Sequence, residues 1–137
     1  MKIKIKLKNL LTFKKNYRGL KMLFIYYPRC STCQKAKKWL DENGFEYDEQ
    51  HIVEDNPDYD QLKALYEKSG LPLKRFFNTS GKIYREMQLK DKLPELSEEE
   101  QLNILASEGM LVKRPIIETE NIVLTGFRQK EWEEKLK

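Results

Sequence analysis

The hydrophobic positions of this 137-residue chain predict strands near both ends and helices between them. Residues 22–27 form a short apolar run that predicts a buried strand. Residues 31–43 carry apolar side chains at helical spacing, and Gly44 is placed to end that helix. Residues 45–53 predict a second strand. Such a strand–helix–strand unit favours parallel pairing through a right-handed crossover.

The middle of the chain has the pattern of several helices. Residues 58–70 carry apolar side chains at helical spacing, and Asp58 is a suitable N-cap. Ser97 is followed three residues later by Glu100, a spacing typical of a capping box that opens a helix. Gly109 is placed to end it. We therefore expect a largely helical insert after the second strand.

Two short apolar segments near the C-terminus predict a closely spaced strand pair. They occupy residues 116–117 and 122–124, and a final helix is expected through Trp132 and Leu136. The order is then strand, helix, strand, helical insert, strand, strand, helix. This order predicts an α/β protein with a thioredoxin/glutaredoxin-like fold and a helical insert after the second strand.

Charge divides the chain into a basic leader and a mildly acidic body. Residues 1–21 hold eight basic residues and no acidic one, whereas residues 22–137 hold 18 basic and 22 acidic residues. The positive net charge of +4 therefore belongs to the leader, and we expect no direct binding of nucleic acid by the body. The expected organisation is a leader over residues 1–21 and one domain over residues 22–137.

The leader has three interpretations. Its longest apolar run is Leu10-Leu11, so it lacks the apolar centre of a signal peptide. The second interpretation is a basic arm that binds RNA or membrane lipids. The third is untranslated sequence that precedes a true start at Met22. The last interpretation is favoured because Arg18-Gly19 can be encoded by a purine-rich run like a bacterial ribosome-binding site. No apolar run of about 18 residues exists, so we expect no membrane association of the body.

The only two cysteines, Cys30 and Cys33, stand between the first predicted strand and the first predicted helix. A Cys-x-x-Cys pair in this position is typical of a redox motif, because the N–H groups and dipole of a helix N-terminus stabilise a thiolate. We expect Cys30 to be the exposed nucleophile and Cys33 to resolve the mixed disulfide. A pair that cycles in this way suits the reducing cytoplasm.

Other interpretations of the cysteines stay open. A zinc site usually needs four ligands, but the chain has no further cysteine, and His51 is its only histidine. Two inert, buried cysteines are disfavoured by the position at a helix start. His51 is either a general base or, because it is far from the cysteines in sequence, a surface or satisfied histidine. We expect no metal and no bound cofactor.

Arg114 and Pro115 precede the third predicted strand and have two interpretations. If the bond between them is cis and lies beside the thiols, Arg114 can hold an oxyanion or stabilise the thiolate. If Pro115 is trans at a strand edge, Arg114 is a solvated side chain. The sequence does not separate the two.

Several separated segments, taken in order, resemble the bacterial arsenate reductase-like (ArsC) family. That family includes glutaredoxin-linked arsenate reductases and the Spx and MgsR regulators. The resemblance covers Met22 to about Leu136. The matching segments are Tyr27-Pro28-x-Cys30-x-x-Cys33-x-Lys35-Ala36, Phe76-Phe77-Asn78-Thr79-Ser80-Gly81, Tyr84-Arg85-Glu86, Glu108 to Pro115, and Gly126-Phe127.

The resemblance implies a thioredoxin-like fold in which Cys30 is the nucleophile and Arg114 binds the anion. Asn78 stands where a reductase would place another anion-binding arginine, and Arg128 is a candidate that lies one residue out of register. A reductase of this family would draw electrons from thioredoxin or from glutathione and glutaredoxin. A Spx-like regulator would instead bind RNA polymerase and use its Cys-x-x-Cys as a disulfide switch. Both functions remain open here, with the enzyme favoured.

Overall fold

The computed structural model describes residues 22–137, and the leader expected over residues 1–21 lies outside the described residues. The described chain divides into two compact units. One contains residues 22–51 and 114–137, and the other contains residues 52–113. The helical insert expected from the sequence is this second unit, and each unit is described by itself below.

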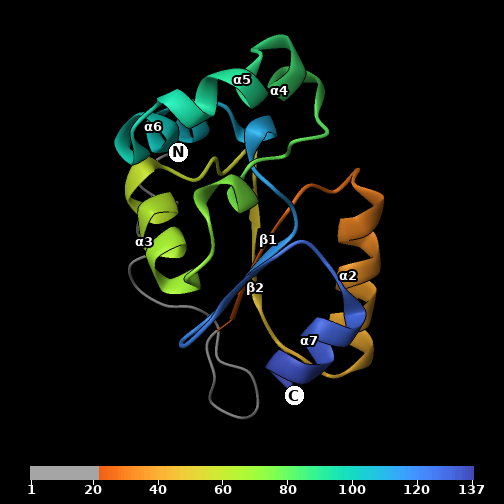
Figure 1. The fold of residues 1–137 in the computed structure, drawn as a ribbon. Coiled ribbons are helices and arrows are strands. Elements are labelled where there is room, and N and C mark those ends of the chain that lie inside the picture. Colours follow the sequence, from red (N-terminus) through yellow and green to blue (C-terminus); the bar gives the residue numbers. More distant parts are fainter. Residues whose placement is uncertain (1–21) are drawn as a thin grey trace. The chain divides into compact units, whose positions relative to one another are not determined.

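The first unit is built on a four-stranded mixed sheet with the strand order β2-β1-β3-β4 (Figure 1). β1 is parallel to β2 and antiparallel to β3, and β3 is antiparallel to β4. This topology confirms the thioredoxin-like α/β fold, including the parallel first pair and the hairpin at the end. The strands are β1 (Met22–Tyr26), β2 (Asp48–His51), β3 (Ile116–Thr119) and β4 (Val123–Thr125).

The second strand is shorter than the sequence pattern predicted. The expectation of residues 45–53 was wrong at both ends, because β1 offers partners only from Leu23 to Tyr26, which pair with Asp48–His51. Phe45 and Tyr47 precede this ladder but are buried in the core. Their burial explains the apolar pattern that extended the predicted strand.

Two helices, α2 (Ser31–Glu42) and α7 (Gln129–Leu136), lie on the same side of the sheet (Figure 1). The indole rings of Trp39 and Trp132 meet edge to face between these helices, with centroids 6.0 Å apart. Trp132 is fully buried, and its Nε1–H donates to the carbonyl oxygen of Gly126 at 3.1 Å. The C-terminal half of α2, which carries Trp39, thereby packs against α7 in an aromatic core.

The second unit consists of helices and short 3₁₀ turns. Asp58 caps α3, and Ser97 with Glu100 forms the predicted capping box at the start of α6. The α-helices are α3 (Tyr59–Ser69), α4 (Lys82–Glu86), α5 (Leu89–Lys92) and α6 (Glu98–Ser107). The 3₁₀ turns are η1 (Leu73–Phe76), η2 (Leu93–Glu95) and η3 (Gly109–Leu111). None of the helices between residues 22 and 137 has the length and apolar character needed to cross a membrane.

Gly109 marks a close approach of two backbones within this second unit. A Cβ atom at this position would lie 2.1 Å from the carbonyl oxygen of Ile52 and 2.6 Å from Oδ1 of Asn56. No side chain fits in that space. Gly109 therefore does more than follow the end of α6, since it lets the start and the end of the unit pack together.

Candidate active site

The loop between β1 and α2 carries the first cysteine to the surface. Cys30 is the N-cap residue of α2, and its N–H donates to the carbonyl oxygen of Tyr27 at 3.0 Å. Its own carbonyl oxygen accepts the first helical hydrogen bond, from the N–H of Gln34. The Cys30 side chain is partly exposed, whereas Cys33 is 1% exposed and belongs to the core beneath α2. A sulfur atom arriving from solvent can therefore reach only Cys30.

The surroundings of Cys30 favour its ionised form. Burial on its own raises the pKa of this thiol, but polar interactions with Cys33 and the N–H of Thr32, with the charge of Arg114, bring the pKa below its ordinary value. The N–H groups face the sulfur without completing a capping hydrogen bond. This is the helix-terminus effect that the sequence predicted, with a cation added.

The surroundings of Cys33 favour its protonated form. Burial raises the pKa of the Cys33 thiol to about 12, and the neighbouring Cys30 adds to the rise. The N–H of Tyr27 and the charge of Arg114 act in the opposite direction and are outweighed. At neutral pH the pair therefore consists of one activated sulfur and one protonated sulfur, and both are free thiols in this structure.

Sheet register brings Arg114 to the site. β1 and β3 are antiparallel with Ile25 opposite Ile116, and the same register continued by two residues places Arg114 opposite Tyr27. The guanidinium carbon of Arg114 lies 5.5 Å from the centroid of the Tyr27 ring. The Arg114–Pro115 peptide bond is cis. Of the two interpretations that the sequence left open, the geometry corresponds to the one with Arg114 beside the thiols.

His51 lies at the end of β2 and contacts the loop rather than the cysteines. Its ring is edge-on to Tyr27, with centroids 5.6 Å apart, and it also meets Tyr26 at 6.2 Å. His51 is far from both cysteines in sequence. The parallel register, which pairs Tyr26 with His51, explains why His51 lies beside Tyr27 at the start of the loop.

Arg128, the other candidate anion-binding residue, begins the last helix. It is the N-cap residue of α7 with an exposed side chain, and within residues 22–137 no described interaction joins it to either cysteine. Tyr27, by contrast, was not predicted as a site residue. In the sequence Tyr27 is only one position of a motif, yet in the structure it contacts Cys30, Arg114 and His51.

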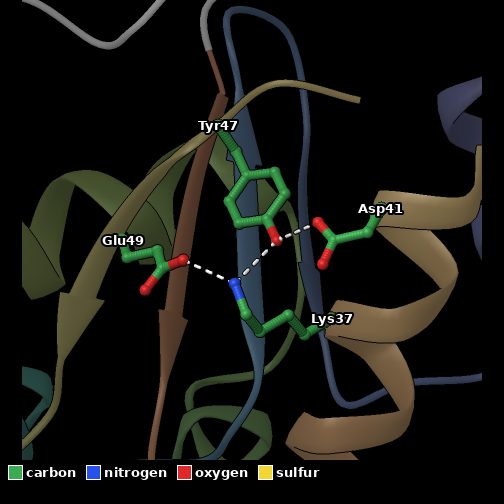
Figure 2. A network of polar contacts seen from close by, with 4 residues as sticks. All are labelled: Lys37, Asp41, Tyr47 and Glu49. Atoms are coloured by element: carbon green, nitrogen blue, oxygen red, sulfur yellow. Dashed lines mark hydrogen bonds and ion pairs between the residues drawn. The ribbon is translucent and has the colours of Figure 1, made fainter. Parts of the chain in front are cut away.

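A polar network holds α2 against the neighbouring edge strand (Figure 2). The Nζ atom of Lys37, one turn after Cys33, lies 2.6 Å from Oε2 of Glu49 and 3.1 Å from the Tyr47 hydroxyl. That hydroxyl donates to Oδ1 of Asp41 at 2.6 Å. Burial opposes the charge of Lys37, but its bonds to Glu49 and Tyr47 raise its pKa. The helix that carries both thiols is thus attached to the sheet at its middle.

The described residues contain no candidate metal centre. Within residues 22–137, no three or more His, Cys, Asp or Glu side chains are placed to hold a metal ion. A zinc site built from this part of the chain would require such a group.

The family model named ArsC family matches residues 25–135. The chain belongs to the ArsC family. The uncharacterized protein YusI of Bacillus subtilis is 56% identical over 115 residues, which cover 84% of this chain and 98% of YusI. A crystal structure of a protein related to the ArsC family from Bacteroides fragilis is 57% identical. It aligns with a TM-score of 0.80 over 82% of this chain and 95% of its own.

The family also contains regulators. The global transcriptional regulator Spx 2 of Bacillus anthracis is 28% identical over 102 residues, which cover 74% of this chain and 76% of Spx 2. These matches confirm the resemblance seen in the sequence to a family that includes both arsenate reductases and Spx-type regulators. The matches alone do not distinguish an enzyme from a regulator.

Proposed function

We propose that this ArsC-family protein is a cytoplasmic thiol–disulfide oxidoreductase that uses Cys30 and Cys33 as its redox pair. The observation that carries the proposal is the contrast between the two thiols. Cys30 is accessible and its pKa is lowered, whereas Cys33 is buried and its pKa is raised to about 12. A nucleophile and a resolving thiol need this difference, because only one sulfur should attack first.

The reaction proceeds in two exchanges. The Cys30 thiolate attacks one sulfur of a substrate disulfide, the substrate S–S bond breaks, and one substrate thiolate leaves. Cys33 then gives up its proton and attacks the Cys30 sulfur of the mixed disulfide, which releases the second substrate thiolate. The substrate gains two electrons, and the protein is left with a Cys30–Cys33 disulfide.

Arsenate is the second substrate class that this site could serve. Arg114 would hold the anion beside Cys30, and Arg128 is a candidate for a further contact. Asn78, in place of a reductase arginine, weakens this version. In it, Cys30 replaces one oxygen of arsenate, which leaves as water. Cys33 then attacks Cys30, and the arsenic departs as arsenite with two electrons.

The oxidised pair must be reduced from outside in either version. Thioredoxin, or glutaredoxin with glutathione, supplies two electrons and two protons by the same exchange chemistry in reverse. No bound cofactor is needed for this cycle.

The relative Spx 2 supports a second candidate function, that of a redox-switched regulator that binds RNA polymerase. In that case the Cys30–Cys33 disulfide would be a signal rather than an intermediate. The observation that would distinguish this regulator from the enzyme is capture of RNA polymerase by only one oxidation state of the protein.

The test is NADPH consumption by the purified protein, coupled in parallel to thioredoxin and glutaredoxin relays. A small disulfide such as oxidised glutathione and arsenate are offered separately. Turnover with the disulfide supports a general oxidoreductase, and turnover that needs arsenate supports a reductase. No turnover with either, together with polymerase capture that depends on oxidation, overturns the enzyme in favour of the regulator.

Two variants check the assigned roles. Cys30→Ser should abolish turnover, because the attacking sulfur is removed. Cys33→Ser should accumulate a mixed disulfide between Cys30 and the substrate, visible by intact mass. Full turnover by Cys30→Ser would contradict the mechanism whatever the substrate.

A further inference from the structure

Tyr27 contacts each of the groups that define the candidate site, although the proposed reaction gives it no role. Its carbonyl oxygen accepts from the N–H of Cys30 at 3.0 Å, and its own N–H faces the sulfur of Cys33. Its ring lies 5.5 Å from the guanidinium carbon of Arg114 and edge-on to His51 at 5.6 Å. The backbone of Tyr27 therefore interacts with the two cysteines, and its ring interacts with the guanidinium of Arg114.

The contact with the Tyr27 ring restricts the position of the Arg114 guanidinium. An arginine side chain has a long, flexible stem, so its charge acts on a nearby thiolate only if the guanidinium is held in place. A guanidinium over an aromatic face within about 6 Å is attracted by the ring quadrupole. Tyr27 is itself half-buried, which strengthens this attraction by excluding water from part of the ring.

Register makes the arrangement a property of the sheet rather than of a mobile loop. Tyr27 follows the last residue of β1, and Arg114 precedes β3 at the position opposite. His51 ends β2 and pairs with Tyr26, so its ring reaches the same place from the other side of β1. Three neighbouring strands thus deliver the cation, the ring and its edge-on neighbour to one end of the sheet.

We propose that Tyr27 is a positioning residue whose ring holds the guanidinium of Arg114 beside the two cysteines, with His51 packed against the same ring. This inference rests on the thiol chemistry proposed above and adds how the positive charge is kept at the thiols. It has a direct redox consequence. Reduction of the disulfide by two electrons and one proton gives a thiolate at Cys30 and a thiol at Cys33. A cation held nearby stabilises that reduced form and makes the disulfide easier to reduce.

The test compares Tyr27→Leu with Tyr27→Phe in the full chain. Both variants keep the backbone interactions of residue 27, and only the second keeps an aromatic face. The readout is the rate of Cys30 alkylation by iodoacetamide from pH 5 to 10, followed by intact mass. We expect Tyr27→Leu to lower the rate at pH 7 by about three- to tenfold and to move the midpoint to higher pH. Tyr27→Phe should stay within about twofold of the parent.

A double-variant cycle separates positioning from a general disturbance of the loop. Arg114→Gln should lower the rate at least as much as Tyr27→Leu, and adding Tyr27→Leu to it should change nothing further. An unchanged profile in Tyr27→Leu, or the same loss in the Arg114→Gln background, overturns the proposal. If Tyr27→Leu does not fold by circular dichroism, Tyr27→Met replaces it in both comparisons.

Because alkylation needs no substrate, this result is independent of the proposed function. An unchanged profile contradicts the positioning role of Tyr27 but does not contradict the proposed oxidoreductase function. A shifted profile in a protein that turns over neither disulfide nor arsenate supports the role of Tyr27 and removes the enzyme. Equilibration with a dithiothreitol redox buffer gives a second reading. Tyr27→Leu should require at least about threefold more reductant for half reduction, and no change would count against the proposal.

Discussion

Cys33 lies three positions after Cys30, yet Cys33 is 1% exposed while Cys30 opens to solvent at the N-cap of α2. Burial raises the pKa of Cys33, whereas hydrogen bonds from Cys33 and Thr32 and the charge of Arg114 outweigh burial at Cys30 and lower its pKa. Two chemically identical groups thereby have pKa values on opposite sides of the ordinary value. The first two predictions below follow from this separation.

Alkylation at neutral pH should modify one cysteine only. The parent protein treated with iodoacetamide at pH 7 should gain a single adduct, on Cys30. The Cys30→Ser variant should react at least about 100-fold more slowly, because Cys33 is both buried and protonated. Intact mass against time measures both rates. Cys33→Ser is the matched control and should react within a few-fold of the parent, whereas fast labelling of Cys30→Ser would show that Cys33 is accessible.

The stability of the reduced protein should fall at alkaline pH because of Cys33. Its pKa is about 12 in the folded state against an ordinary value of 9.0, so the unfolded thiol ionises first as pH rises. Its contribution is fully present below pH 9 and is lost as pH rises towards 12, with a slope of at most about 1.4 kcal/mol per pH unit. Urea unfolding at pH 8 and 10.5 measures the change.

The comparison for this second prediction uses a Cys30→Ser background. The pKa of Cys30 is lowered by folding, so its contribution has the opposite sign and would mask part of the effect. In that background, replacing Cys33 by Ala should cost less stability at pH 10.5 than at pH 8. An equal cost at both pH values contradicts the assignment.

The ion pair between Lys37 and Glu49 should contribute modestly to stability. Glu49→Gln should lower the free energy of unfolding by about 0.5–1 kcal/mol, since both side chains remain about 40% exposed and water weakens the attraction. Glu86→Gln is the matched control, because its pair with Lys82 is longer, at 3.8 Å, and more exposed. Urea unfolding at low and high salt should show a larger loss for Glu49→Gln at low salt.

Replacing Gly109 by Ala should be strongly destabilising. A methyl group there would meet the carbonyl oxygen of Ile52 at 2.1 Å, a distance that forces the backbones apart. We expect a loss of about 2 kcal/mol or more in urea unfolding. Asn103→Ala, at an exposed position of α6, should change stability by less than about 0.5 kcal/mol. Comparable values for the two variants would mean that the close approach relaxes at little cost.

The position of Cys30 at the start of a helix could be predicted from the sequence because it is local. A strand, a loop and a helix start follow one another in the chain, and the helix terminus acts on Cys30 through the N–H groups of Thr32 and Cys33. The capping box of Ser97 and Glu100 is local in the same sense. Helices α4 and α5 were missed because four or five residues are too short to show a helical period.

The contacts of Tyr27 with Arg114 and His51 could not be predicted in this way. They depend on two ladders, one antiparallel and one parallel, whose partners lie far from Tyr27 in sequence. No periodicity in the chain fixes those registers. Once they are known, the position of Arg114 opposite Tyr27 follows by counting along β1 and β3. The predicted ends of β2 were wrong for a related reason, because the length of β1 limits how many residues of β2 can pair.

The boundaries of the helical unit fall at this site in the chain. Residues 52–113 leave the sheet unit directly after His51 and rejoin it directly before Arg114. Those are the two residues whose side chains flank the ring of Tyr27. Both chain connections between the two units are therefore made at residues that contact the ring of Tyr27.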